Sequence, residues 1–356
     1  MSSDTVSVII PTYNRAHCLG NAVDSVLTQT HAHVEAIIID DGSTDGTSNL
    51  VASRYGSDER VRYIQQANGG VAAARNHGFR VARGDFVALL DSDDTWFPYK
   101  LELQLACLAA APRAGMIWTD MKAIRADGTV EHERYLRVMY SAYRFFKTED
   151  IFGESHPLGE IAPGLASQVG DRRLWVGDVF SPMVVGNLVH TSTVLLRRAR
   201  REQVGEFDPK LQQAGEDYPF HLRTCRAGPV AFADIPTICY QRGTPDRLTR
   251  FSLPMARNFL NTLTETLRND RERIVLPEGL IRTVLAEAHA WVGEEQLAGG
   301  ARGEAIREFA TSLRHRPRQP RIAGLLALAT LPPSAADLLR RVYRRIKGAA
   351  RQTSAA

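Results

Sequence analysis

The sequence predicts an α/β fold in which a mainly parallel sheet is flanked by helices and followed by an α-helical C-terminal extension. Three observations support this prediction. Short apolar runs alternate with helix-like stretches over residues 6–94, which is the pattern of repeated strand–helix units. Polar residues follow each apolar run, as they do at the carboxyl edge of a parallel sheet. Beyond residue 250, the pattern indicates helices alone.

The first three strand–helix units can be placed in order. The run VSVIIPTYNR at 6–15 is rich in β-branched residues, breaks at Pro11 and precedes an amphipathic stretch. The second strand, AIIID at 36–40, ends in aspartates and is followed by turn and helix-capping residues. The third, VRYIQQ at 61–66, turns through two glycines into the small-residue helix VAAARNHGFRVA. Right-handed crossovers bring such strand ends to one crevice.

The fourth strand leads into a group of carboxylates. The run GDFVALLDSDDTWFP at 84–98 places a continuous apolar stretch directly before Asp91, Asp93 and Asp94. Carboxylates this close repel one another, and a cation such as Mg²⁺ or Mn²⁺ that bridges to phosphate oxygens would keep them ionised. The alternative is a loop of capping aspartates, with Asp94 at the start of a helix near Phe97.

A second group of motifs follows in the later part of the chain. It comprises GNLVHTSTVLLRR at 186–198, VGEFDPKL at 204–211 and AGEDYPFHLR at 214–223. The motifs PTYNR, IIIDDGSTDGT, NGGVAAARNHG and LLDSDDTWFP precede this second group, in that order. With these motifs, the sequence resembles family 2 glycosyltransferases of the GT-A fold. The resemblance covers roughly residues 5–250 and does not extend to the tail beyond.

The resemblance implies a catalytic domain over 1–250. Its Rossmann-like nucleotide-sugar-binding half would be 1–125 and its acceptor-binding half 126–250. The residue after the first strand and the second aspartate of the DDGS segment would contact the nucleotide. The family's metal-binding DxD motif falls on Asp91 and Asp93, with Asp93 as the chief ligand of Mg²⁺ or Mn²⁺. The nucleotide-sugar-binding candidates are Pro11, Thr12, Asn14, Asp41, Arg75, Asp91, Ser92 and Asp93.

The same resemblance implies a general base. An inverting transfer needs a group that removes the proton of the acceptor hydroxyl, and in the family the second acid of an ED pair usually acts. Here this is Asp217, with Glu216 as its support or as a contact to the donor sugar. The alternative is that both acids only offset the dipole of the helix that they begin. We expect His190, from the preceding motif, to be structural.

One stretch departs from the family pattern. Many relatives carry a tyrosine, an arginine and then a histidine near a small-residue turn, whereas CYQRGTPDRLTR at 239–250 contains no histidine. Arg242 and Arg247 are the candidates to replace this histidine near Gly243 over the diphosphate. The QxxRW motif of processive synthases is also incomplete, because the tryptophan is missing. The sequence therefore argues against a processive polysaccharide synthase.

Composition sets further bounds. A chain of 356 residues that is 44% hydrophobic and 24% charged can bury one large core plus an appendage. The four cysteines are scattered, which argues against a zinc site or a disulfide framework. We expect no signal peptide before the first strand. The apolar run IAGLLALATL at 322–331 is shorter than the roughly twenty residues that a spanning helix needs. These features indicate a cytoplasmic protein.

Residues 251–356 are predicted to form a helical region. The segment 291–317 resembles one tetratricopeptide unit, a helix pair around Gly299 and Gly300. The final part from Arg314 onward is strongly basic and contains one acid, Asp337. This basic tail suggests peripheral attachment to anionic lipid on the inner face of the plasma membrane; a solvated tail is the alternative. Nucleic acid is not an expected partner, because no recognition motif is present.

The sequence thus predicts a hexosyltransferase-type enzyme. It would be inverting and metal-dependent and would move one sugar from a nucleotide diphosphate donor, with UDP-sugar expected, to a saccharide or lipid-linked saccharide in bacterial surface polysaccharide biosynthesis. One alternative is a haloacid-dehalogenase-like phosphatase, since LLDSDDT fits a DxDxT pattern with Asp91 as nucleophile and Asp93 as acid/base. The other is a sugar-binding protein without turnover.

Overall fold

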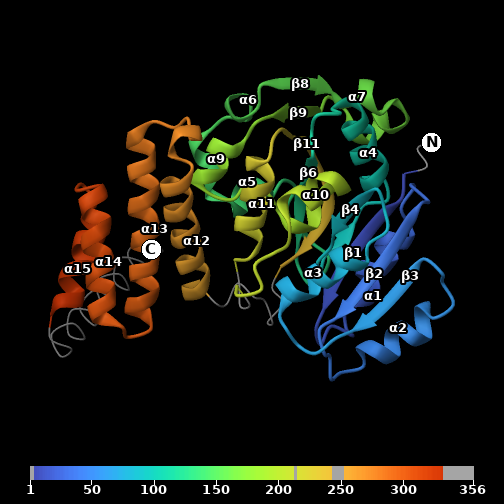
Figure 1. Cartoon of the computed structure of the whole chain (residues 1–356), viewed down its shortest axis with the longest axis horizontal. Coiled ribbons are helices and arrows are strands. Elements are labelled where there is room, and N and C mark those ends of the chain that lie inside the picture. Colours follow the sequence, from blue (N-terminus) through green and yellow to red (C-terminus); the bar gives the residue numbers. More distant parts are fainter. Residues whose placement is uncertain (1–3, 212–214, 243–251, 332–356) are drawn as a thin grey trace, which may run out of the picture. The chain divides into compact units, whose positions relative to one another are not determined.

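A computed structural model describes residues 4–211, 215–242 and 252–331 of the chain (Figure 1). Arg247 and the greater part of the basic tail, from residue 332 onward, lie outside the described residues. The chain divides into two compact units. The first consists of Met1–Arg250 with Asp270–Ile274, and the second of Phe251–Asn269 with Val275–Ala356.

The N-terminal half of the first unit is a parallel sheet. Strands β1 (Val6–Thr12), β2 (Val34–Asp40), β3 (Val61–Gln65) and β4 (Phe86–Leu89) lie in the order β3-β2-β1-β4, and each pairs in parallel with its neighbour. The residues of β1 and β4 are buried along the whole length of both strands, as expected for strands covered on both faces. The predicted α/β fold with a mainly parallel central sheet is confirmed.

Helices connect these strands. They are α1 (Leu19–Leu27), α2 (Thr47–Tyr55) and α3 (Val71–Val81). Helix α3 packs very closely on β1, because a Cβ added at Gly78 would lie 2.3 Å from a side-chain carbon of Ile9. Gly70, which precedes α3, has φ of 86°, a conformation that glycine adopts without strain. The small residues of this helix therefore set its distance from the sheet.

The segment after β4 differs from the capping alternative. A short strand, β5 (Thr95–Trp96), follows residues 91–94, which we call the acidic loop. Helix α4 (Lys100–Ala110) begins only after this strand. Tyr99 occupies the N-cap position, and no side chain caps this helix. Asp94 therefore does not cap a helix starting near Phe97, and the capping alternative is wrong. Strand β5 pairs with strand β11 (Val230–Gln241), so an extended segment precedes the start of α4.

The C-terminal half of the first unit extends the same sheet. Strand β10 (Leu195–Arg197) lies antiparallel between β4 and β6 (Met116–Ile124), and β11 (Val230–Gln241) runs parallel to β6. Strands β9 (Arg173–Gly177) and β8 (Glu154–Pro157) complete this edge in antiparallel order, while β7 (Val130–His132) pairs with β6 off the main path. One sheet thus spans both predicted halves.

Short helices cover this second half. They are α5 (Leu136–Met139), α6 (Thr148–Ile151), α7 (Leu158–Ile161), α8 (Ala166–Val169), α9 (Phe180–Val185), α10 (Arg198–Val204) and α11 (Asp217–Arg226). Aromatic side chains fill the space between them and the sheet. Phe152, Trp118 and Phe232 are buried and contact one another, with ring centroids between 5.5 and 6.0 Å apart. Phe152 therefore belongs to the core.

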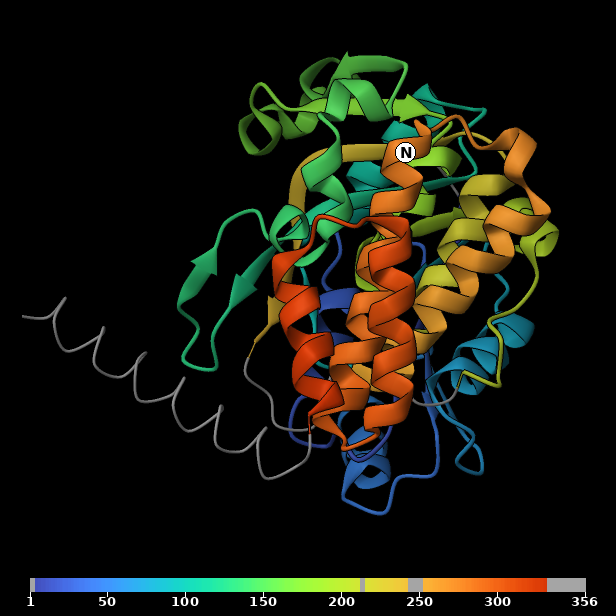
Figure 2. The same ribbon diagram turned by 90° about the vertical axis from the view of Figure 1, so that its left-hand side faces the viewer.

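The second unit is helical (Figure 2). Its helices are α12 (Ser252–Asn269), α13 (Glu278–Ala298), α14 (Arg302–His315) and α15 (Pro320–Thr330), and successive helices contact one another. Phe309 is fully buried in a small core that includes Ala290, Ala305 and Ile322. The turn at Gly299 and Gly300 joins α13 to α14. None of the described helices has the length and hydropathy needed to cross a membrane.

Candidate functional site

The acidic loop follows β4 at the carboxyl edge of the parallel strands. Asp91 and Asp93 remain partly accessible, with 31% and 21% of their side chains exposed. Asp94 and Ser92 are buried. The Asp93 carboxylate lies 3.8 Å from the guanidinium of Arg15, which comes from the loop after β1. The loop therefore presents two accessible carboxylates over a buried third.

Arg75 on α3 joins this loop to the second group of motifs. Its guanidinium donates to Asp91 Oδ1 at 2.7 Å and to Glu216 Oε1 at 2.5 Å, and the side chain is almost fully buried. Burial lowers the pKa of Arg75, but the two carboxylates outweigh that effect and raise it. Burial alone would raise the pKa of Asp91, but the positive charge of Arg75 outweighs it and holds this pKa below its usual value. Both ions therefore stay charged.

Glu216 and Asp217 stand at the start of helix α11. Glu216 is buried in its ion pair with Arg75, whereas Asp217 is half-buried and accepts a hydrogen bond from Asn187 Nδ2 at 3.2 Å. Burial, followed by the charge of Glu216, raises the pKa of Asp217 to about 7. A carboxylate with this pKa can take up a proton near neutral pH. The arrangement therefore separates an ion-pairing acid from an acid suited to proton transfer.

The candidates at the ends of β1 and β2 hold the loops together. Asp41 accepts three hydrogen bonds, from Gln66 Nε2, Gly69 N and Gly70 N, at 2.7 to 2.9 Å. Asn14 has a φ of 53°, and its side-chain oxygen accepts from Thr44 N at 2.8 Å. In this structure both side chains are used to fix the loops that border the site.

Pro11 and Thr12, the remaining candidates of β1, are buried. The backbone carbonyl of Thr12 accepts from Asp41 N at 2.8 Å, which ties the end of β1 to the end of β2. The Thr12 hydroxyl is buried and makes no hydrogen bond to any of the described residues. It is available to a ligand at this edge.

Helix α11 and a distant tyrosine contribute groups that the sequence reasoning did not select. His221 lies one turn after Asp217 and is fully buried; burial, with the nearby charge of Arg75, lowers its pKa to about 3. Burial and the negative charges of Asp217 and Asp91 raise the pKa of Tyr140. The i,i+4 spacing from Asp217 could have indicated His221. No sequence signal indicated Tyr140.

His190, which we expected to be structural, lies near the acidic loop. Its charge, after that of Arg75, helps to lower the pKa of Asp91, and its ring packs edge-on against Tyr240 at 5.1 Å. On β11 the chain also reaches the loop, since Gln241 N lies 3.4 Å from Asp94 Oδ1. The second half of the sheet thus closes one side of the site.

The acidic loop suits a divalent cation that has additional ligands from a bound molecule. Asp91 and Asp93 offer accessible carboxylate oxygens, the ligands that Mg²⁺ prefers. Within the described part of the chain, no cluster of three or more His, Cys, Asp or Glu side chains is arranged to hold a metal. Asp94 Oδ2 is buried and accepts no hydrogen bond from the described residues, so positive charge nearby would stabilise it. Two protein ligands fit an ion that is shared with a diphosphate.

The candidates to replace the missing histidine are Arg242 and Arg247. The Arg242 guanidinium pairs with Glu131 on β7 at 2.7 Å and lies over the ring of Tyr135 at 5.2 Å. Arg242 is therefore already committed to an ion pair, and Arg247 lies outside the described residues.

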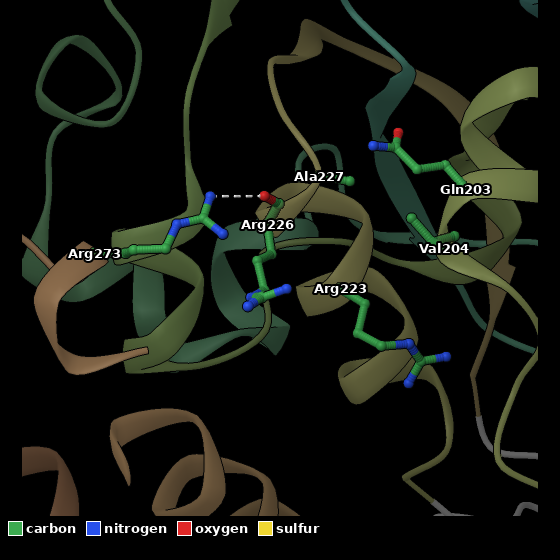
Figure 3. A pocket seen from close by; sticks show the side chains of 6 residues that line it. All are labelled: Gln203, Val204, Arg223, Arg226, Ala227 and Arg273. Carbon is green, nitrogen blue, oxygen red and sulfur yellow. Dashed lines mark hydrogen bonds between the residues drawn. The ribbon is translucent and has the colours of Figure 1, made fainter. Parts of the chain in front are cut away.

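A separate cavity of about 330 Å³ lies at the C-terminal ends of α10 and α11 (Figure 3). Its arginines are engaged by acceptors of the protein. Arg223 donates to Glu206 O, Arg226 to Asp270 Oδ1, and Arg273 to the backbone carbonyl of Arg226, as Figure 3 shows for the last pair. The contacts of Arg226 and Arg273 tie Asp270–Ile274 to the rest of the first unit, so the arginines have a structural role.

Comparison with known proteins gives the family of the N-terminal part. Residues 7–159 match the family described as glycosyl transferase family 2. A glycosyltransferase of Rickettsia felis named as uncharacterized is 52% identical over 100 residues, or 28% of this chain and 16% of that protein. TuaG of Bacillus subtilis, whose name refers to teichuronic acid biosynthesis, is 42% identical over 125 residues, or 35% of this chain and 49% of TuaG.

These matches are partial. The alignments span between 14% and 30% of the length of four curated relatives from Rickettsia and Nostoc. A solved structure covers much more of the chain: TarS 1-349 of S. aureus in complex with UDP-GlcNAc has a TM-score of 0.58 at 18% identity, over 98% of this chain and 92% of that one. At this identity, the likeness shows the fold alone. Residues 7–159 therefore match glycosyl transferase family 2, and the fold of the chain is similar to that of TarS.

Proposed function

We propose that this protein is an inverting, metal-dependent glycosyltransferase of the hexosyltransferase type. It moves one sugar from a nucleotide diphosphate donor, for which we expect a UDP-sugar, to a saccharide or lipid-linked saccharide. The family 2 domain supports the reaction class. The name of TuaG favours a role in polysaccharide biosynthesis, and the TarS complex with UDP-GlcNAc favours the donor class. The domain over 1–250 would be catalytic.

One observation carries the proposal: Arg75 pairs with both Asp91 and Glu216, at 2.7 and 2.5 Å. This contact links the acidic loop, the candidate donor site, to the helix that begins with Asp217, the candidate base. Glu216 lies 141 residues beyond Arg75 in the sequence. A sugar transferase requires these two functions on either side of one reacting carbon. The buried ion pair supports their placement in a single site.

The base step follows from the environment of Asp217. With a pKa near 7, this carboxylate is partly ionised at neutral pH and gains a proton readily when the acceptor hydroxyl attacks. Asn187 orients one of its oxygens, and Glu216, held by Arg75, keeps a negative charge beside it. Burial, with the charge of Glu216, thus raises the pKa of the base, while Glu216 itself is engaged in the ion pair with Arg75.

Asp93 and Asp91 would hold the divalent cation, with Asp94 behind them. When bound, Mg²⁺ or Mn²⁺ would supply neutralisation of the negative charge that develops on the departing diphosphate. Arg15, beside Asp93, adds positive charge at the same place. Two further polar atoms border this region and are not bonded to the described residues, the Thr12 hydroxyl and Arg75 Nε. Both suit hydrogen bonds to the donor.

The test is calorimetric titration of the full chain with UDP, GDP, dTDP and ADP, each with and without Mn²⁺. We expect one nucleotide, UDP, to bind only with the metal. Asp93→Ala should abolish this binding, and Asp171→Ala, at an exposed position before β9, should leave it unchanged.

Three outcomes would contradict the proposal. Nucleotide binding of equal affinity with and without Mn²⁺ would contradict the proposed metal dependence. No binding of any nucleotide, together with turnover of a phosphate ester, would favour the phosphatase. No turnover at all, with binding of free sugars, would favour a sugar-binding protein.

Peripheral attachment of the basic tail to the membrane stays a prediction. Sedimentation of the full chain with vesicles would check it. We expect binding to vesicles that contain phosphatidylglycerol and not to vesicles of phosphatidylcholine alone, with binding that weakens as salt rises. Equal sedimentation with both vesicle types would contradict an electrostatic attachment.

A further inference from the structure

The turn Thr191–Thr193 lies against the acidic loop although it is about a hundred residues away in the sequence. Ser192, at its centre, is fully buried. Its hydroxyl oxygen accepts from the backbone N–H of Asp91 at 3.1 Å. Ser192 therefore holds the start of the acidic loop.

The turn is itself held from the other side by three side chains. Trp96 Nε1 donates to the carbonyl of Ser192 at 2.9 Å, and Gln104 Nε2 donates to the carbonyl of Thr193 at 2.8 Å. Lys100, fully buried, donates to Gln104 Oε1 at 2.6 Å and lies over the Trp96 ring at 4.0 Å. Lys100 thus fixes the orientation of the Gln104 amide, with its N–H groups toward the turn.

The same turn reaches the helix of the candidate base. The Thr191 hydroxyl and His221 Nε2 are 3.3 Å apart, within hydrogen-bond distance. His221 follows Asp217 by one helical turn on α11. The segment from Thr191 to Thr193 therefore contacts the acidic loop through Ser192 and the base helix through Thr191.

We propose that Ser192 is a positioning residue for the donor site: through the hydrogen bond to its hydroxyl it fixes the backbone of Asp91. This inference rests on the proposed function. The loop contains three carboxylates, which repel one another and would spread apart without fixed contacts. The hydrogen bond to the backbone N–H of Asp91 fixes the chain just after β4, at a residue that is itself a candidate metal ligand. The Trp96, Lys100 and Gln104 contacts give the turn the rigidity that this requires.

The first measurement needs no ligand. Hydrogen exchange of the Asp91 amide, resolved by NMR, should become about threefold to tenfold faster in Ser192→Ala, because one buried hydrogen bond is lost. Gln104→Met, which releases the turn from outside the loop, should act in the same direction with a smaller effect. The effects of the double variant should be less than additive, since both changes act through one turn. Ser53→Ala, an exposed helical serine that donates to Leu50 O, should match the wild type.

The second measurement uses UDP with Mn²⁺ and turnover of the UDP-sugar. In Ser192→Ala we expect the Kd of UDP and the KM of the donor to rise by about threefold to tenfold, with kcat at saturating donor within about twofold of the wild type. Such a split identifies a residue that acts on donor binding; general loss of structure would lower kcat and the melting temperature together.

Two results would overturn the inference. One is an unchanged exchange rate of the Asp91 amide in Ser192→Ala. The other is faster exchange with an unchanged Kd for UDP, which would leave Ser192 without a role at the donor site. If the wild type itself binds no nucleotide, the proposed function fails, and the exchange measurement alone still decides whether Ser192 positions the loop. Should Ser192→Ala not fold, Gln104→Met decides by the same two readouts.

Discussion

Replacing Asp217 by Asn tests the candidate base through two independent properties. Asparagine has nearly the shape of the protonated acid and can still accept a hydrogen bond from Asn187, so donor affinity should not change. It cannot take up a proton from the acceptor hydroxyl. We therefore expect kcat to fall by about a hundredfold to ten-thousandfold, the usual range for loss of a general base.

The structure also predicts an effect on stability and its sign. Burial and the charge of Glu216 raise the pKa of Asp217 from 3.8 to about 7, so the folded state binds this proton more tightly than the unfolded state does. The stabilisation is fully present below about pH 4 and is lost as the pH rises through 7. At about 1.36 kcal/mol per pKa unit, the loss is up to about 4 kcal/mol, and less where solvent reaches the half-buried carboxylate. Asparagine, which does not ionise, escapes this loss.

The assay is urea unfolding at pH 4, 7 and 9, with transfer rates measured in parallel. Relative to the wild type, Asp217→Asn should gain in free energy of unfolding between pH 4 and pH 9, by up to about 4 kcal/mol. Asp171→Asn, at an exposed aspartate, should show no such gain. If the free energy of unfolding changed with pH equally in the wild type and in Asp217→Asn, the inference that burial raises the pKa of Asp217 would be refuted. Transfer at the wild-type rate would refute the role as base.

Further predictions concern the ion pair and the helical unit. Arg75→Met should lower the free energy of unfolding by about 3–5 kcal/mol, because Asp91 and Glu216 lose their cation, whereas Arg80→Met, in an exposed pair, should cost less than about 1 kcal/mol. Arg75→Met should also raise the pKa of Asp91 and shift Mn²⁺-dependent UDP binding to higher pH; an unshifted profile would contradict this coupling. Gly293→Ala should destabilise the second unit by about 1–3 kcal/mol, since its Cβ would lie 2.7 Å from the Phe309 ring. Gly303→Ala, with open space around it, should be neutral or stabilising; equal effects on the melting temperature would refute the packing argument.

Local patterns were sufficient for the first half of the fold. Strands β1 to β4 lie where the strand patterns predicted them. Strands β1, β2 and β4 are almost entirely buried, whereas the residues of the edge strand β3 are half-buried or exposed. The alternative in which Asp94 caps a helix was wrong for a tertiary reason. The strand β5, which displaces the start of α4, exists only because β11 lies beside it, and β11 comes more than a hundred residues later.

The site shows the same division. The sequence singled out Asp91, Asp93 and Asp217 from short motifs, but each motif had an alternative structural explanation. It could not show that Arg75 would ion-pair with both Asp91 and Glu216, since that depends on the packing of α3 against α11. Tyr140 comes close enough to Asp217 to sense its charge, although nothing in the sequence around Tyr140 indicates it.

By itself, the sequence determined the order of the N-terminal strands and helices, the carboxyl edge at which polar residues gather and the family resemblance, because periodicity and turn chemistry act over a few residues. Only the tertiary structure decided which carboxylates are buried, paired or raised in pKa, because desolvation and ion pairing depend on segments that are distant in the chain. Ser192 illustrates the limit: its role depends on a contact with Asp91, about a hundred residues earlier. Short motifs therefore predict which residues gather at this edge of the sheet, and the tertiary structure determines their pKa values and contacts.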